Sequence, residues 1–225
     1  MLHLVTRLRL VGLLCAVVAF SVTAAPAPVY KPRPTKLWFD GWNKPIAGAG
    51  NGHFARDSKT LTITVPDINP GDPALLLREV EGDFVLEVRV NGRFHTANAF
   101  GERKAGIVVQ FGGTRVRMDR VTENKFGTVS GGFSSEWRGT GRDGGQGNAY
   151  VFQDASNIAY FRATRKGNKL ILEAKEDKGE WATRNDNCPA LTLPKKIEVG
   201  VSAEATAAGP FAVEFDQFRL TKQGE

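Results

Sequence analysis

The sequence predicts an all-β fold, a two-sheet antiparallel sandwich with little or no helix after the N-terminal segment. Apolar residues alternate with polar ones in nearly every later segment, which is the pattern of strands that have one buried face. Turn signals separate these segments at short intervals, and no later stretch has a persuasive helical period. The predicted turns are at Gly112-Gly113, Gly131-Gly132, Lys166-Gly167-Asn168 and Lys178-Gly179. The length of 225 residues is suited to one large sandwich domain.

The alternation can be followed along the chain, and it assigns one apolar face to each expected strand. The residues expected to face the core are Leu61, Ile63 and Val65; Phe84, Leu86, Val88 and Val90; Ile107, Val109 and Phe111; Val116 and Met118; Phe161 and Ala163; Leu170 and Leu172; Ile197, Val199 and Val201; and Phe211, Val213 and Phe215. In the last strand, Phe218 and Leu220 have the opposite parity. We therefore predict a β-bulge at Asp216 and Gln217, which returns both apolar sets to one face.

The N-terminus has the layout of a secretory signal. Basic residues precede an apolar run at residues 10–22, and small residues follow it. We expect a signal peptide at residues 1–24, a proline-rich leader at 25–36 and a single domain at 37–221, with its first strand starting at residues 37–39. The apolar run is about half of the roughly 20 residues that a membrane-spanning helix needs. We expect an exported protein (secreted, periplasmic or at the cell surface) without a membrane span.

The net charge indicates whether the protein binds nucleic acid, and the number of cysteines indicates whether a disulfide stabilises it. The net charge is +6 and falls to about +4 when Arg7 and Arg9 leave with the signal peptide. The charges alternate in sign along the strands, so we expect no nucleic-acid partner. Because Cys15 lies in the signal peptide, Cys188 has no partner for an internal disulfide. Cys188 is expected to be a partly buried thiol, with a reactive thiol as the alternative, in a monomer stabilised by its core.

Five segments, taken in order, resemble one family. They are residues 76–90 (LLREVEGDFVLEVRV), 105–111 (AGIVVQF), 114–120 (TRVRMDR), 160–181 (YFRATRKGNKLILEAKEDKGEW) and 210–220 (PFAVEFDQFRL). In these segments the chain is similar to secreted concanavalin A-like β-sandwich domains, including the C-terminal module of β-xylosidases and the "regulation of enolase" branch. The resemblance implies a jelly-roll sandwich over nearly the whole mature chain. Residues 128–153 match no segment of that family, and short motifs inform on fold more than on activity.

Candidate ligand-binding residues come from the polar faces of the predicted strands and from one tryptophan. Trp137 precedes a glycine-rich segment, where its indole ring could stack on a sugar ring; covering an edge of the core is the alternative. The strand residues could line a concave sheet if their strands are neighbours, with a cross-strand ladder of ion pairs as the alternative. The residues predicted to bind a ligand are Trp137, Gln110, Arg117, Asp119, Tyr160 and Arg162.

Catalytic and metal-binding patterns are not found in the sequence. Glucanases of this superfamily carry three acids on one strand, but Glu214 and Asp216 have no third acid and are expected on a solvated strand face. His53 and His95 fit no nucleophile triad or zinc site. We expect no cofactor, although loop carboxylates could hold a structural calcium ion. The segment 139–147 lacks the ending of a phosphate-binding loop and is expected to be a flexible loop.

Three functions are compatible with these patterns. The first hypothesis is a lectin-like module that binds a glycan or a similar cell-surface polymer without catalysis. The alternatives are a glycoside hydrolase or related carbohydrate-active enzyme, and a structural or adhesive envelope protein. A deep groove lined by paired acids would favour the enzyme, a shallow aromatic platform the lectin, and a flat charged face the structural role.

Overall fold

The computed structural model describes residues 52–57, 59–66, 73–95, 100–125, 128–139, 142–146, 150–152, 156–183 and 192–223. These residues form β-strands and no helix, so none of them belongs to a helix that could span a membrane. The strands are β1 (His53–Arg56), β2 (Leu61–Val65), β3 (Ala74–Glu81), β4 (Asp83–Gly92), β5 (Gly101–Phe111), β6 (Thr114–Lys125), β7 (Thr128–Gly139), β8 (Arg142–Gln146), β9 (Tyr150–Phe152), β10 (Ile158–Lys166), β11 (Lys169–Glu176), β12 (Ala182–Thr183), β13 (Lys196–Ala205) and β14 (Phe211–Gln223). The predicted signal peptide, leader and first strand at 37–39, and Cys188, lie outside the described residues.

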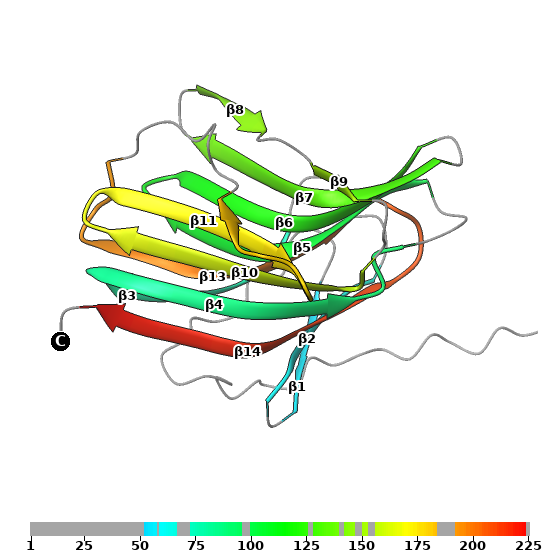
Figure 1. The fold of residues 1–225 in the computed structure, drawn as a ribbon, viewed down its shortest axis with the longest axis horizontal. Helices are drawn as coiled ribbons and strands as arrows, with labels where there is room; N and C mark the ends of the chain where they lie inside the picture. Colours follow the sequence, from blue (N-terminus) through cyan, green and yellow to red (C-terminus); the bar gives the residue numbers. More distant parts are fainter. Residues whose placement is uncertain are drawn as a thin grey trace, which may run out of the picture. The chain divides into compact units, whose positions relative to one another are not determined.

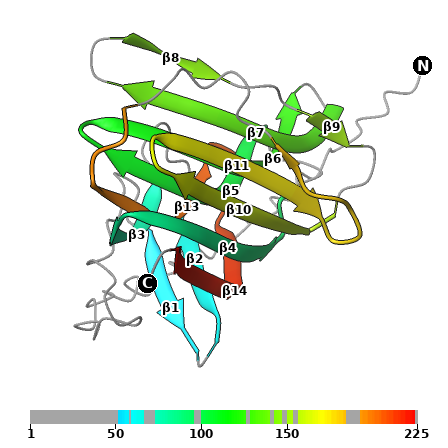
Figure 2. The same ribbon diagram turned by 60° about the vertical axis from the view of Figure 1, so that its left-hand side comes forward.

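The strands form two antiparallel sheets that pack face to face (Figure 1 and Figure 2). The first, called here the β4 sheet, has the order β1-β2-β14-β4-β10-β11-β12. The second, called the β5 sheet, has the order β3-β13-β5-β6-β7-β8, and β9 pairs with β7 beside β8. The predicted two-sheet antiparallel sandwich is confirmed.

The core lies between the two sheets, and the predicted alternation places its residues correctly. Every residue of the predicted inward-facing sets is buried, except Phe111, which is partly buried against the same core. Phe133 of β7 and Phe161 of β10 meet across the core with their ring centroids 5.6 Å apart and nearly perpendicular planes, a favourable geometry for aromatic pairs. The alternation therefore decides which side chains hold the sheets together.

The predicted bulge in the last strand is confirmed. The pairing of β14 with β4 shifts between Asp216 and Arg219, and Gln217 has a φ of 50°. The extra residue brings Phe218 and Leu220 back to the core side, where both are partly buried. One strand thus supplies apolar side chains to the core along both of its halves.

Gln217 adopts a left-handed backbone conformation that costs a residue with a Cβ atom roughly 1–2 kcal/mol. We expect Gln217→Gly to raise the free energy of unfolding by up to about 1 kcal/mol, because glycine adopts this conformation readily. Urea denaturation measures this change, and Ala212→Gly, at an exposed position of the same strand without a positive φ, is the control. A loss of stability in Gln217→Gly would contradict the assigned backbone geometry.

Two glycine-based predictions were wrong. Gly131 and Gly132 were expected to form a turn, but both lie inside β7, where a Cβ on Gly131 would lie 3.2 Å from the guanidinium nitrogens of Arg120. Glycine at position 131 therefore leaves room for the Arg120 side chain and does not reverse the chain. Residues 139–147 were expected to be a flexible loop, but Arg142–Gln146 pair with β7 as β8. The backbone of β8 pairs with the otherwise free edge of β7, and the local sequence of residues 142–146 does not reveal this distant partner.

Candidate functional site

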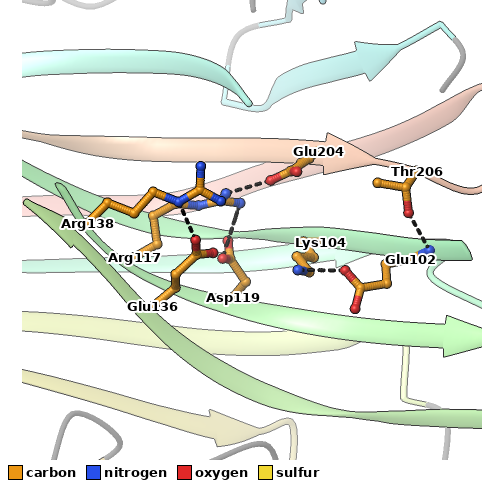
Figure 3. Close-up of polar contacts among 8 residues, drawn as sticks. All are labelled: Glu102, Lys104, Arg117, Asp119, Glu136, Arg138, Glu204 and Thr206. Atoms are coloured by element: carbon orange, nitrogen blue, oxygen red, sulfur yellow. Dashed lines mark hydrogen bonds and ion pairs between the residues drawn. The ribbon is translucent and has the colours of Figure 1, made fainter. Parts of the chain in front are cut away.

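Charged side chains gather on the outer face of the β5 sheet, the face turned away from the core. On β6, Val116 and Met118 face the core, so Arg117 and Asp119 project outward. Glu204 of β13 projects to the same face, and its carboxylate meets the guanidinium of Arg117 across the sheet (Figure 3). We call Arg117, Asp119 and Glu204 the ionic cluster.

Gly106 of β5 makes room for this cluster. It lies between Asp119 on β6 and Ser202 on β13 in one row across three strands. Because Gly106 has no side chain, the Ser202 hydroxyl reaches across β5 and donates to the Asp119 carboxylate at 3.3 Å. A Cβ at position 106 would lie 1.9 Å from the carbonyl oxygen of Met118, so no other residue fits without moving the backbone.

The ionic cluster is buried and tightly bonded. The Arg117 guanidinium donates to the Glu204 carboxylate at 2.6 Å and contacts the Asp119 carboxylate at 3.1 Å (Figure 3). The exposed fractions of the three side chains are 4% for Arg117, 1% for Asp119 and 8% for Glu204. The positive charge of one guanidinium is thus shared between two carboxylates in a nearly solvent-inaccessible environment.

Burial of the cluster changes the acidity of Asp119. Loss of hydration raises the pKa of Asp119 from its ordinary 3.8 to about 6, and the nearby Glu204 carboxylate acts in the same direction. Arg117 and Lys104 act against this rise. Burial by itself disfavours the protonated guanidinium, but the two carboxylates outweigh it and the pKa of Arg117 is raised. Asp119 therefore takes up a proton at a higher pH than an ordinary aspartate does.

More exposed pairs surround the ionic cluster. Lys104 and Glu102 on β5 pair at 2.6 Å, and Glu136 pairs with Arg138 on β7 (Figure 3). Gln110 of β5 donates to Glu198 of β13 at 3.3 Å. Within the described residues, no three His, Cys, Asp or Glu side chains gather where they could hold a metal ion. The outer face of the β5 sheet is thus a network of compensated charges.

The chemistry open to the ionic cluster is limited by its own bonds. A carboxylic acid with a raised pKa beside a second carboxylate is the pair that glycosidases use. Here, however, both carboxylates are bonded to Arg117 and nearly inaccessible, so a substrate would have to displace these bonds. The arrangement is better suited to stabilising the sheet than to attacking a glycosidic bond.

The outer face of the β4 sheet carries an accessible ladder of ion pairs. Arg162 of β10 pairs with Glu87 of β4 at 2.7 Å and with Glu173 of β11 at 3.5 Å. Arg89 of β4 donates from its Nε to Asp216 of β14 at 2.7 Å. These side chains are exposed by about a fifth to a third. The cross-strand ladder that the sequence left as an alternative is therefore present on this face.

Two aromatic rings lie on the same outer face. The guanidinium of Arg162 lies 4.1 Å from the centre of the Trp181 ring, a close cation–π contact. The Lys175 ammonium lies 4.9 Å from the ring centre of Tyr160 and 5.4 Å from that of Trp181, which places both rings in one patch. All four side chains are partly exposed. We call Tyr160, Arg162, Lys175 and Trp181 the aromatic patch.

The six predicted ligand-binding residues do not form one site. Gln110, Arg117 and Asp119 lie on the outer face of the β5 sheet, whereas Tyr160 and Arg162 lie on the outer face of the β4 sheet. Trp137 lies within β7 and packs against the core, which is the alternative interpretation of this residue. The condition that all these strands are neighbours is not met, because β6 and β10 belong to different sheets.

Glu204 and Trp181 were not among the predicted residues. Glu204 has the same parity as Ser202 on β13, so the alternation contained a signal for its outward direction. Trp181 follows the turn after β11, and its ring lies beside Arg162 and Lys175. Glu214 and Asp216 lie on the partly solvated strand face, as expected, where they contact Asn91 and Arg89.

No protein-family model and no curated protein matches the chain. Among solved structures, a functionally unknown protein from Saccharomyces cerevisiae is similar with a TM-score of 0.61 and 17% identity, over 83% of this chain and 98% of that one. Alginate lyase from Klebsiella pneumoniae is similar with a TM-score of 0.51 and 10% identity, over 76% of this chain and 84% of that one. What they share is the fold.

A GH43 protein from Bacillus licheniformis is also similar, with a TM-score of 0.49 and 13% identity over 72% of this chain and 33% of that one. Identities this low establish the sandwich fold and leave the activity open.

Proposed function

We propose that this chain is an exported, non-catalytic protein that binds a glycan on the aromatic patch of the β4 sheet. The observation that carries the proposal is the placement of Tyr160 and Trp181 around Lys175 on an accessible sheet face. Aromatic side chains combine an apolar ring surface with a polar edge, which suits the apolar faces and hydroxyl groups of sugar rings. The sequence resemblance to β-xylosidase modules supports a glycan as the ligand class.

The charges around the aromatic patch favour an uncharged, hydroxyl-rich ligand. Arg162 is held between Glu87 and Glu173, and Arg89 is held by Asp216, so each guanidinium already has a carboxylate partner. Such pairs are ordered in advance and can exchange hydrogen bonds with hydroxyl groups while their charges stay balanced. A strongly acidic polymer would have to compete with these carboxylates.

Catalysis is not part of the proposal. Asp119 of the ionic cluster has a pKa raised to about 6, as a catalytic acid would need. Its carboxylate, however, is 1% exposed and is bonded to Arg117 and Ser202. On the β4 sheet, Glu87 and Glu173 are paired with Arg162, and Asp216 is paired with Arg89, which keeps these three from acting as a free acid or base. Glu214 accepts a hydrogen bond from Asn91.

The proposal can be tested with neutral polysaccharides. We expect the purified protein to be retarded in native gels that contain one of xylan, a mixed-linkage β-glucan or a mannan. Trp181→Ala and Tyr160→Ala should each weaken this binding at least tenfold, which corresponds to about 1.4 kcal/mol. Each variant should keep the urea midpoint of the parent to within a small shift, because both rings lie on the outer face.

Phe100→Ala is the matched control, because Phe100 is a large exposed aromatic residue, 64% exposed, that lies outside the aromatic patch. It should bind like the parent. Absence of retardation by all of the polysaccharides, or equal binding by the Trp181 and Tyr160 variants, would refute the proposal.

A further inference from the structure

A pocket of about 670 Å³ lies at the end of β4. Its walls include Asn91 and Arg93 from the end of β4 and the residues that follow, Glu214 from β14, and His95 and Asn157 from connecting segments. Arg103 of β5 also lines it, although β5 belongs to the other sheet. The volume is in the range of pockets that bind small molecules.

Arg103 is fixed in place by backbone contacts. Its Nη1 donates to the carbonyl of Arg93 at 3.0 Å, and its Nη2 donates to the carbonyl of Pro210 at 3.3 Å. The guanidinium also lies 5.5 Å from the ring centre of Phe211. These contacts hold the planar group at the pocket while leaving several of its five N–H bonds unused.

The charge of Arg103 has no counter-ion in the described part of the chain. The residue is 7% exposed, and its buried Nε has no hydrogen-bond partner among the described residues. Burial lowers the pKa of Arg103, and no carboxylate acts in the opposite direction, in contrast to Arg117. Because a buried charge without a partner is costly, the site is more stable when an anion occupies it.

The polar groups of the pocket indicate which anion would fit. A guanidinium presents N–H groups in a planar fork that matches the two oxygens of a carboxylate. Glu214, which accepts a hydrogen bond from Asn91 at 3.2 Å, lines the same pocket and would repel a second negative charge but accept a hydroxyl hydrogen. The pocket therefore combines a place for one carboxylate with a place for hydroxyl groups.

We propose that this pocket binds a small hydroxylated carboxylate, of which sugar acids are the simplest examples, with the carboxylate paired to Arg103. Asn91, Asn157 and Glu214 provide hydrogen-bonding groups for the hydroxyls. The site is distinct from the aromatic patch, since it uses other residues, and it does not depend on the proposed glycan binding.

The proposal is tested by titrating the full-length protein with D-glucuronate, D-glucose and inorganic phosphate, using isothermal calorimetry and ligand-observed NMR. We expect saturable binding of glucuronate, no saturation with glucose at the same concentrations, and at least tenfold weaker binding of phosphate. Arg103→Lys keeps the charge but removes the fork, and it should weaken glucuronate binding at least tenfold. If Arg103→Lys fails to fold, Arg93→Gln, which changes the mouth of the pocket, should weaken glucuronate binding several-fold.

Two control variants distinguish binding in this pocket from binding elsewhere on the surface. Arg138→Lys, an exposed arginine on β7, should leave glucuronate binding unchanged, and so should Trp181→Ala in the aromatic patch. The proposal is overturned if glucuronate does not bind, if the Arg103 and Arg93 variants bind it like the parent, or if phosphate binds equally well. Loss of glucuronate binding in Trp181→Ala would instead move the carboxylate to the aromatic patch and would also overturn it.

Discussion

Arg117→Met is expected to lower the free energy of unfolding by about 3–5 kcal/mol, the range found when one partner of a buried ion pair is removed. The substitution keeps much of the side-chain volume but leaves Asp119 and Glu204 buried without their guanidinium. Domains of this kind are stable by only about 5–15 kcal/mol, so the loss is a large part of the total.

Urea denaturation at about pH 7.5 measures this effect, at a pH where Asp119 is ionised. Arg138→Met is the matched control, because Arg138 lies on the same outer face in an exposed pair with Glu136 and should change stability by less than about 1 kcal/mol. Replacing Arg117, Asp119 and Glu204 together by apolar residues should regain most of the loss, since no buried charge remains. A change of less than about 1 kcal/mol in Arg117→Met would show that the cluster is not buried in solution.

Stability should rise by about 1.4 kcal/mol as the pH falls from about 7.5 to about 5, because about one pH unit of this range lies below the folded-state pKa of Asp119. The pKa of Asp119 is raised to about 6 in the folded protein, against an ordinary 3.8, so the folded state binds this proton more tightly than the unfolded chain does. The gain is therefore complete below about pH 4 and is lost as the pH rises through 6. Each unit of difference in pKa corresponds to about 1.4 kcal/mol.

Asp57 and Glu81 act with the opposite sign, because their pKa values are lowered by hydrogen bonds from the backbone of Lys59 and from the Lys195 side chain. The stability that Asp57 and Glu81 contribute is lost only below about pH 5, where these carboxylates take up protons. Comparing urea midpoints between about pH 7.5 and about pH 5 therefore isolates Asp119. Asp119→Asn should flatten the pH dependence, whereas Glu79→Gln, in an exposed pair with Lys196, should leave it unchanged. The same pH dependence in Asp119→Asn as in the parent would assign the effect to other groups.

Local patterns in the sequence predicted the strands in which apolar and polar residues alternate, their buried faces and the bulge at Gln217, but not β7 and β8. This works because a strand has a strict period of two, so Phe84 and Leu86 must share a face wherever the strand lies. The turns at Gly112–Gly113 and at Gly167 were also predicted correctly, since the positive φ values there need glycine.

The pairing of distant strands could not be predicted in the same way. Arg117 and Arg162 have similar alternating surroundings, yet β6 and β10 lie in different sheets, which separates the candidate residues. The period also does not reveal that Leu77 and Val108 are buried on the outer face, on either side of Gly200 of β13. Such contacts join residues far apart in the chain, and a single sequence contains no local record of them.

The positions of the last two strands have a consequence for the order in which the protein can fold. β13 lies between β3 and β5, and β14 lies between β2 and β4, so the final strands of the chain are the central connections of both sheets. A chain that emerges from its N-terminus therefore cannot complete either layer until residues 196–223 are available. Folding dominated by such distant pairings takes milliseconds to seconds. Both layers are therefore expected to form together, after the last two strands have been made.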